Sequence, residues 1–283
     1  MKILSIDGLC KQYPAFRLEN VSFSMEAGTI MGLIGRNGAG KTTTLKAMLH
    51  LVHPDAGKIT ICGLDMDSDE RKIRSRIGYV SGGASYYPRR RLRELTAVTK
   101  SFYPDWDDAR YARLLRQFSL DESKRVCELS EGMKVKYQLA AAMSHKAELL
   151  ILDEPTSGLD PVSRDELLDT FLTLCEQEGV SILFSTHITS DLDACADTIT
   201  YLQNGRVAVS ADKKTLTGAY LSVQGADAAC SAALRGALIG ARSHKGVLDA
   251  LIRTQDAPLA AGLTVCPANL ERIMVHLERE AEA

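Results

Sequence analysis

One stretch of the chain constrains the fold more than any other: Gly35-Arg36-Asn37-Gly38-Ala39-Gly40-Lys41-Thr42. It fits the pattern G-x-x-x-x-G-K-[ST], a loop that binds phosphate groups. The apolar run 30–34 before it predicts a buried strand, and residues 42–49 after it predict a helix. Such a loop turns backbone N–H groups toward an anion, and the helix directs its positive end at the same anion. The stretch therefore predicts a polyphosphate site within an α/β fold.

The last two residues of the loop predict how the phosphates are held. Lys41 supplies a point charge for the terminal phosphates, and the Thr42 hydroxyl is placed to hold Mg²⁺. Tyr13 lies about twenty residues before the loop, where an aromatic ring could stack on an adenine base, because such stacking can contribute about 1–3 kcal/mol. A half-buried tyrosine at a strand edge is an equally good reading of the same position.

Composition and charge exclude several other classes of protein. The 283 residues are 45% hydrophobic and 25% charged, with a net charge of −2, so the chain has no electrostatic bias toward nucleic acid. No apolar run approaches the roughly 20 residues that span a bilayer. The first residues reach Asp7 too early for a secretory signal, which predicts a cytoplasmic protein. The seven cysteines contain no C-x-x-C pair, so disulfide and metal roles are not expected.

The order of predicted elements indicates two regions. Strands and helices alternate over most of residues 1–217, and a block at about 86–147 reads instead as an inserted helical subdomain. From 218 the chain becomes alanine-rich and weakly patterned, and ends in a predicted helix at 268–280. We expect a phosphate-loop core with a mostly parallel sheet, flanking helices and an antiparallel β part, and a small C-terminal accessory region at 218–283.

Polar residues follow two buried strands of this core. Asp153 ends the apolar run 149–152 and can orient Mg²⁺ through its water shell. Glu154 beside it can accept a proton from an attacking water or hold that water in line. His187 ends the next strand, where it could donate to the γ-phosphate or orient the water. The carboxyl ends of neighbouring parallel strands form the usual site edge of an α/β sheet.

Two helices are predicted in the inserted block, at 106–120 and 131–144. A further cue is Leu129-Ser130-Glu131-Gly132-Met133, at the start of the second of them. A serine hydroxyl and backbone amides at a helix N-terminus make an anion site, although the same residues also suit an ordinary helix start. Together with the phosphate loop, Asp153-Glu154, Ser157-Gly158-Leu159-Asp160 and His187, this order resembles the ATP-binding cassette (ABC) ATPases over about residues 2–217. The chain is similar to the single-cassette subunits of bacterial exporters.

The resemblance implies a fold, two ligands and a partner. Members of the family bind ATP and Mg²⁺ and form head-to-tail dimers, in which each ATP lies between the phosphate loop of one subunit and the Leu-Ser-x-Gly element of the other. ATP binding closes the dimer, hydrolysis opens it, and the movement drives a membrane permease. The implied catalytic residues are Glu154 and His187, and the implied metal residues are Thr42 and Asp153. The residues implied to contact ATP or to lie at the dimer junction are Tyr13, Gly35, Arg36, Asn37, Gly38, Ala39, Gly40, Lys41, Thr42, Thr43, Ser130, Glu131, Gly132, Met133 and Asp160.

The chain departs from the family pattern at two places. The usual Leu-Ser-Gly-Gly-Gln reads Leu-Ser-Glu-Gly-Met here, which keeps Ser130 and Gly132. A glutamine that contacts Mg²⁺ and water usually follows the strand predicted at 76–80, but this chain has Ser81-Gly82-Gly83 and no glutamine nearby. Farther on, the basic cluster Arg89–Arg93 is either a docking point for a permease loop or a solvated basic face.

These observations predict the ATP-hydrolysing subunit of an exporter, acting at the inner face of the cell membrane through a separate permease and most simply as a homodimer. The alternative is an ABC-type regulatory ATPase that is not coupled to transport. Action on nucleic acid is not expected, because the chain has one cassette, no heptads and a pI near 6.3. The transported substrate is not predicted, and region 218–283 could serve dimer contact, regulation or packing.

Overall fold

The strand predicted before the phosphate loop lies inside the central sheet of the computed structural model. Strand β3 (Ile30–Ile34) pairs in parallel with β8 (Ser181–Thr186) on one side and β9 (Thr198–Gln203) on the other. All of its residues are buried, which explains why the run is apolar without alternation. The full order is β10-β9-β3-β8-β7-β6, with β6 (Ile77–Ser81), β7 (Leu149–Asp153) and β10 (Arg206–Asp212). This confirms the predicted, mostly parallel core.

A second, antiparallel sheet is formed largely by the N-terminal part of the chain. Its order is β2-β1-β4-β5, with β1 (Lys2–Tyr13), β2 (Phe16–Glu26), β4 (Ala56–Ile61) and β5 (Leu64–Asp65). The apolar run 3–6 and the alternating run 21–25 predict strands and lie within β1 and β2, which are both longer than these runs. They extend to a tight turn in which Tyr13 faces Phe16 across the antiparallel ladder.

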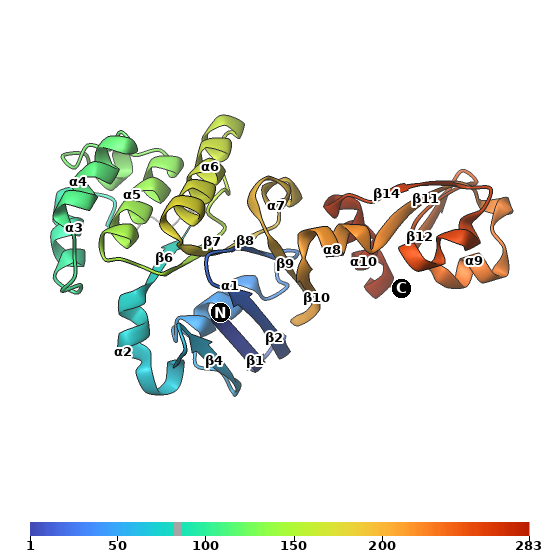
Figure 1. Ribbon diagram of the computed structural model, residues 1–283, viewed down its shortest axis with the longest axis horizontal. Coiled ribbons are helices and arrows are strands. Elements are labelled where there is room, and N and C mark those ends of the chain that lie inside the picture. The colour runs from blue at the N-terminus through green and yellow to red at the C-terminus, as the bar shows by residue number, and fades with distance from the viewer. Residues whose placement is uncertain (82–86, 283) are drawn as a thin grey trace. The chain divides into compact units, whose positions relative to one another are not determined.

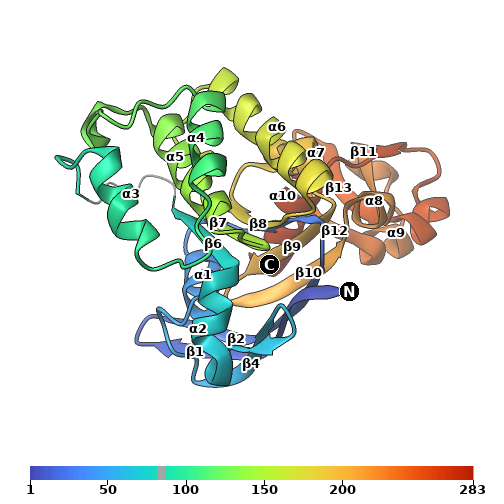
Figure 2. The ribbon, with the colours of Figure 1, turned by 60° about the vertical axis from the view of Figure 1, so that its left-hand side comes forward.

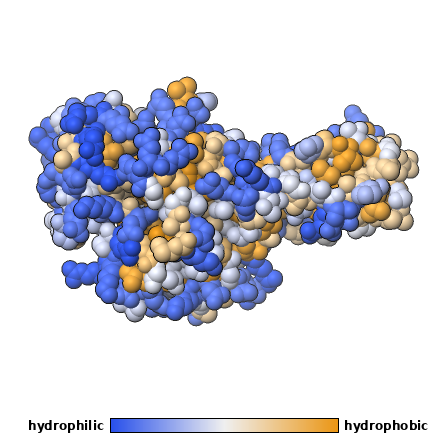
Figure 3. Space-filling model, viewed as in Figure 1, coloured by the Kyte–Doolittle hydropathy of each residue, from blue (hydrophilic) through white to orange (hydrophobic). Residues whose placement is uncertain are grey.

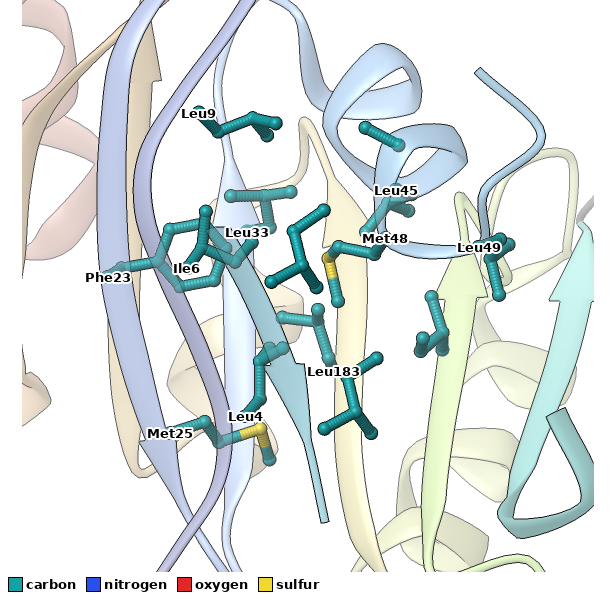
Figure 4. Packing of buried hydrophobic residues seen from close by; sticks show 14 of the residues in the cluster. Leu4, Ile6, Leu9, Phe23, Met25, Leu33, Leu45, Met48, Leu49 and Leu183 are labelled. Atoms are coloured by element: carbon teal, nitrogen blue, oxygen red, sulfur yellow. The ribbon is translucent and has the colours of Figure 1, made fainter. Parts of the chain in front are cut away.

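The main hydrophobic core lies between these two sheets. Figure 4 shows Leu4 and Phe23 of the antiparallel sheet pointing toward Leu33 of β3, with Met48 and Leu183 beside them. Met48 belongs to α1 (Lys41–Met48), the helix that follows the phosphate loop. Packing of α1 into this cluster holds the loop at a fixed place over the end of β3, because buried side chains have few alternative arrangements.

Helices cover the other face of the parallel sheet. Figure 2 shows α5 and α6 on one side of β7 and β8, with α1 and the antiparallel sheet on the other. The helices of residues 1–210 are α1, α2 (Met66–Arg76), α3 (Leu92–Lys100), α4 (Asp108–Gln117), α5 (Glu131–Ser144), α6 (Pro161–Glu178) and α7 (Thr189–Cys195), with the 3₁₀ turn η1 (Val126–Glu128).

The predicted inserted helical block corresponds to α3, α4 and α5, which gather at one end of the unit (Figure 1). Helix α3 was not predicted, because charged residues stand between the apolar positions of its sequence. Buried hydroxyl groups join the three helices: Thr96 Oγ1 of α3 lies 2.7 Å from Tyr111 Oη and 3.0 Å from Tyr137 Oη. Burial raises the pKa of Tyr111 far above its usual value, so this phenol stays neutral.

Residues 211–283 form a compact unit of their own, separate from 1–210. Its sheet has the order β12-β13-β11-β14, with β11 (Tyr220–Ala226), β12 (Leu238–His244), β13 (Val247–Arg253) and β14 (Thr264–Pro267). Its helical elements are α8 (Lys213–Gly218), η2 (Asp227–Ala229), α9 (Ala232–Ala237), η3 (Thr254–Ala260) and α10 (Leu270–Glu282). The predicted terminal helix is confirmed, whereas this sheet was missed by sequence reasoning.

The structure describes residues 1–81 and 87–282. The glycines at 82–83, where the sequence departs from the family pattern, therefore lie outside the described residues. Within the described part, no helix is both long and apolar enough to cross a membrane. The face of the 1–210 unit seen in Figure 3 is mainly hydrophilic, with hydrophobic residues in small groups.

Candidate functional site

The phosphate loop has a backbone that only glycine accommodates at two of its positions. A Cβ atom on Gly35 would lie 2.4 Å from the carbonyl oxygen of Leu202, so the loop can pass this close to β9 only without a side chain. Gly40 precedes α1 with φ of 109°, a left-handed conformation that other residues rarely adopt. These constraints hold the loop in the shape that presents its N–H groups to an anion.

The lysine of the loop is almost completely buried and contacts a carboxylate. Lys41 is 5% exposed, and its Nζ donates to the carbonyl oxygen of Gly35 at 2.7 Å. The same Nζ lies 3.2 Å from Glu154 Oε1. Removal of an ammonium group from water is costly unless opposite charge or hydrogen bonds compensate it. Lys41 and Glu154, predicted from distant parts of the chain, therefore meet at one point.

A second polar cluster joins the start of α1 to the end of β7. Thr42 Oγ1 donates to Asp153 Oδ1 at 3.2 Å, and Ser185 Oγ donates to the same oxygen at 2.7 Å. Ser185 Oγ also accepts from the Glu154 N–H at 2.9 Å. Ser185 was not singled out from the sequence, although its place in the polar end of β8 is a signal that could have found it.

The pair of Thr42 and Asp153 suits a magnesium ion. Mg²⁺ prefers oxygen ligands, keeps several waters and is usually held by one or two protein groups together with phosphates. Among residues 1–81 and 87–282, no group of three or more His, Cys, Asp or Glu side chains is arranged to hold a metal. A magnesium ion at this hydroxyl and carboxylate would therefore need phosphate oxygens as additional ligands.

The two predicted catalytic side chains contact each other. His187 Nδ1 lies 2.8 Å from Glu154 Oε2, so a protonated Nδ1 donates to the carboxylate. His187 is 44% exposed at its side chain and Glu154 is 22% exposed. Glu154 has φ of 50°, an uncommon conformation for a residue with a side chain, and such conformations cluster at functional sites. One carboxylate thus bridges Lys41 and His187.

These residues surround a pocket of about 550 Å³ at the phosphate loop. The predicted residues in its lining are Arg36, Asn37, Gly38, Gly40, Lys41, Thr42, Thr43, Glu154 and His187. Ala15, Phe16 and Ser157 line it as well and were missed by sequence reasoning. Tyr13 does not belong to the lining, so its stacking on adenine stays a prediction. Gly35 and Ala39 belong to the loop but do not line the pocket.

A buried carboxylate behind the site joins two of its loops. Asp191 is 0% exposed and its Oδ2 accepts from Thr156 Oγ1 at 2.6 Å and from Thr186 Oγ1 at 3.2 Å. Thr156 follows Glu154 in the chain, and Thr186 precedes His187. One carboxylate oxygen therefore links the two segments that carry the predicted catalytic residues. The guanidinium of Arg164 lies 3.8 Å from the other oxygen of Asp191.

The residues of the Leu-Ser-x-Gly element, Ser130 to Met133, are called the signature here. They lie apart from this pocket, at the start of α5. Ser130 is exposed and caps the helix, accepting from the Met133 N–H at 3.2 Å. Glu131 pairs with Lys134 at 2.6 Å, and Gly132 is buried, with space beside it limited by Leu159 of the following loop. The helix N-terminus is exposed and lies outside the pocket, and its contact with a second subunit stays a prediction.

Asp160 caps the neighbouring helix α6. Its side chain accepts from the N–H groups of Val162 and Ser163 and from Ser163 Oγ at 2.6 Å. Hydrogen bonds from the Ser163 side chain and backbone lower the pKa of Asp160 below its usual value, so the carboxylate stays charged at neutral pH. Its predicted place at a dimer junction stays a prediction.

Comparison with known sequences identifies relatives over most of the chain. The family model described as "ABC transporter" matches residues 18–157, and a model described as "AAA domain, putative AbiEii toxin, Type IV TA system" matches 125–192. The Nod factor export ATP-binding protein I of Burkholderia lata is 38% identical over 67% of this chain and 64% of its own length. The bacitracin transport ATP-binding protein BcrA of Bacillus licheniformis is 31% identical over 72% of this chain and 68% of its own.

Comparison with solved structures also identifies an ABC transporter subunit and related cassettes. One described as the ATP binding subunit of an ABC transporter has a TM-score of 0.68 and 32% identity, covering 76% of this chain and 91% of its own. The dimeric ATP-binding cassette MJ0796, bound to ADP and Pi, has a TM-score of 0.63 at 21% identity, covering 74% and 98%, and supports the fold. The chain spans 64% of the length of its Nod factor export relatives. From its motifs, its fold and these relatives, the chain belongs to the family of ABC transporter ATP-binding proteins.

Proposed function

We propose that this chain binds and hydrolyses ATP and that hydrolysis drives transport through a separate membrane permease. The observation that carries the proposal is the contact of Glu154 with both Lys41 and His187 at the phosphate-loop pocket. A phosphate-binding cation, a carboxylate and a histidine in contact can hold the terminal phosphate and position and deprotonate an attacking water. The relatives named for export and transport support the same function.

Each group has a task in this proposal. Lys41 and the loop N–H groups hold the β- and γ-phosphates, and Thr42 with Asp153 holds Mg²⁺. The metal supplies positive charge that neutralises the phosphate oxygens. Glu154 holds the attacking water in line and accepts its proton, and His187 orients Glu154 through the Nδ1 hydrogen bond. Asp191 keeps the loops of both residues at one separation.

We propose further that two copies of the chain close around ATP. Ser130 and Gly132 of one copy would contact the phosphates in the phosphate-loop pocket of the other, and Asp160 would lie near the junction. The exposed N-terminus of α5 supports this arrangement, because a helix N-terminus attracts anions. The dimeric state of the cassette MJ0796 supports it as well.

ATP turnover by the purified chain, compared with that of Glu154→Gln, tests the catalytic assignment. We expect the substitution to lower kcat by about 10²–10⁴-fold, the usual contribution of a general base. It should leave the affinity for magnesium-ATP within about twofold, because the amide oxygen of glutamine can still accept from Lys41. Equal rates for the two proteins, or no turnover by either even with a permease present, would falsify the assignment.

The partner would be a membrane permease that docks at the helical subdomain. Arg89, Arg90 and Arg93 are exposed there, and a pocket of about 580 Å³ lined by Arg90, Glu94, Val98 and Tyr137 opens beside them. The cationic rim and apolar floor suit an amphipathic loop with acidic residues. Through this contact the chain would work at the inner face of the cell membrane.

Charge reversal tests the docking proposal. Arg89→Glu with Arg90→Glu should abolish stimulation of ATP turnover by the co-purified permease and leave unstimulated turnover unchanged, because neither residue lines the phosphate-loop pocket. Arg91 is a poor choice, since its guanidinium donates to the Ser123 carbonyl oxygen at 2.9 Å and supports the fold. Arg116→Glu, an exposed site on α4, is the matched control. If the permease stimulates ATP turnover of the double variant normally, these arginines do not dock the permease.

A further inference from the structure

A glutamine of α5 contacts the last residue of strand β6 with both ends of its amide group. Gln138 Oε1 accepts from the Ser81 N–H at 3.1 Å, and Gln138 Nε2 lies 3.4 Å from the Ser81 carbonyl oxygen. The same Nε2 lies 3.4 Å from the carbonyl oxygen of Lys134, one turn earlier in α5. The amide is therefore oriented by its own helix while it contacts both backbone polar groups of one residue in another element.

Ser81 occupies a position that is linked to the phosphate-loop pocket. Strand β6 is at the edge of the parallel sheet, and among residues 1–81 and 87–282 no further strand pairs with its outward N–H and C=O groups. On its other side, Ser81 lies opposite Asp153 in the parallel register with β7. Asp153 in turn accepts from Thr42 Oγ1 of the phosphate loop. The strand pairing therefore places Ser81 beside a residue that contacts the phosphate loop.

Gln138 also lies on the helix that carries the signature. It is about two turns after Ser130, the cap of α5, and a helix of this length moves as one rigid rod. The sequence has no glutamine from Ile77 to Arg116, which includes the stretch directly after β6. The structure instead brings a glutamine amide to the end of β6 from α5, a residue that sequence reasoning had no means to select.

We infer that Gln138 is a positioning residue that couples the phosphate-loop pocket to the N-terminus of α5. This inference rests on the proposed ATP-driven dimer. When Thr42 and Asp153 engage nucleotide, the end of β6 is fixed, and the Ser81–Gln138 contact fixes the rotation of α5 and the direction in which Ser130 faces. A side chain without an amide would leave α5 packed on β6 but free to rotate by small amounts.

The experiment separates nucleotide binding from closure of the dimer. In the Glu154→Gln background, which slows turnover, ATP-driven dimerisation is measured by light scattering, and ADP binding by calorimetry. Gln138→Met keeps length and removes both hydrogen bonds, whereas Gln138→Glu keeps an acceptor for the Ser81 N–H and loses the donor. Lys136→Ala is the matched control, because Lys136 joins α5 to Glu166 of α6 at 2.7 Å rather than to β6.

We expect Gln138→Met to weaken ATP-driven dimerisation by about tenfold or more, with ADP affinity within about twofold, since a polar contact is lost away from the nucleotide. Gln138→Glu should be intermediate and Lys136→Ala unchanged. If Gln138→Met does not fold, the inference is tested with Gln138→Glu instead, by the same measurements of ATP-driven dimerisation and ADP binding.

Three results overturn the inference. The first is unchanged dimerisation of the Gln138 variants, and the second is an equal loss of ADP binding and dimerisation, which would indicate a merely structural role. In both, the proposed function stands, because the Glu154→Gln chain still closes around ATP. The third is failure of the Glu154→Gln chain itself to dimerise with ATP, which overturns the proposed dimer and this inference with it.

Discussion

At the scale of single residues, Glu154 shows why one carboxylate can serve several roles. It contacts Lys41 through Oε1 and His187 through Oε2, so one oxygen balances a buried ammonium group while the other contacts the histidine at the pocket. Loss of one partner of a buried ion pair leaves the other uncompensated. Glutamine at this position keeps an acceptor for Lys41, whereas alanine would not, and the amide is therefore the informative substitution.

The aromatic residues near the pocket lead to the first prediction. Phe16 packs on the phosphate loop, because its ring lies 2.8 Å from where a Cβ of Gly40 would be, whereas Tyr13, its partner across the hairpin, does not line the pocket. We expect Tyr13→Ala to weaken ATP binding by about 5- to 150-fold, the range that stacking of about 1–3 kcal/mol gives, and to leave binding of inorganic triphosphate unchanged.

Phe16→Ala is the matched variant for Tyr13. Because Phe16 supports the loop itself, its loss should weaken binding of ATP and of inorganic triphosphate together. Calorimetry with both ligands distinguishes the two roles. A Phe16 variant that loses only ATP binding, beside a normal Tyr13 variant, would transfer the adenine contact from Tyr13 to Phe16.

At the scale of elements, the start of α5 combines a structural and a functional role. Ser130 caps the helix, and its exposed hydroxyl is also the predicted phosphate contact. Aspartate caps helices about as well as serine, but its negative charge repels phosphate. We therefore expect Ser130→Asp to keep the melting temperature and to weaken ATP-driven dimerisation by more than about tenfold. Light scattering with ATP and thermal unfolding without it measure the two effects.

Ser130→Ala provides the comparison for this prediction. It loses the cap, at a cost of about 1 kcal/mol, without adding charge. If Ser130→Asp dimerises with ATP as readily as the wild-type chain, Ser130 does not face a phosphate.

A histidine of α10 makes the stability of the C-terminal unit depend on pH. His276 is 1% exposed, its Nδ1 donates to the Gly240 carbonyl oxygen at 2.9 Å, and its Nε2 lies 3.4 Å from Asp249 Oδ2. Arg272 and Arg279 also face Asp249. Burial lowers the pKa of His276 below 6.5, so the folded unit binds its proton less readily than the unfolded chain.

The sign of the pH effect follows from this lowered pKa. The stability is fully present above the ordinary histidine pKa of 6.5 and is lost as the pH falls below it, because the unfolded chain then takes up the proton. We expect hydrogen exchange, corrected for intrinsic rates, to show less protection of 211–282 at about pH 5 than at about pH 8. His276→Gln should reduce this difference, and His244→Gln, at an exposed site, should not. Equal protection at both pH values contradicts the assignment.

At the scale of the whole molecule, the predicted ATP site is contained in one unit. Every residue assigned to it precedes residue 192, and residues 1–210 form a compact unit with the main core between their two sheets. We expect a chain ending at 217, the predicted domain boundary, to turn over ATP within about threefold of the full chain, a difference below about 1 kcal/mol. A folded fragment without ATP binding would assign residues 218–283 a role in the site.

The sequence was sufficient wherever neighbouring residues decide the structure. The strand before the phosphate loop, the glycines of the loop and the helix after it are consecutive, and the hairpin turn at Asn204-Gly205 is marked by two residues that both adopt positive φ. The C-terminal sheet was missed because β11 pairs with β13 and β14, which come much later in the chain, and its short strands have weak alternation. Such pairing is a property of the fold rather than of a local pattern.

The sequence by itself determined that a phosphate loop follows a buried strand, because glycine conformation and strand burial can be read from adjacent residues. Only the tertiary structure decided that Glu154 meets both Lys41 and His187, that Ser185 and Asp191 hold the loops around them, and that Gln138 reaches Ser81. These contacts join residues from different strands and helices. Their geometry is set by how the sheet and its covering helices pack, which no short stretch of sequence encodes.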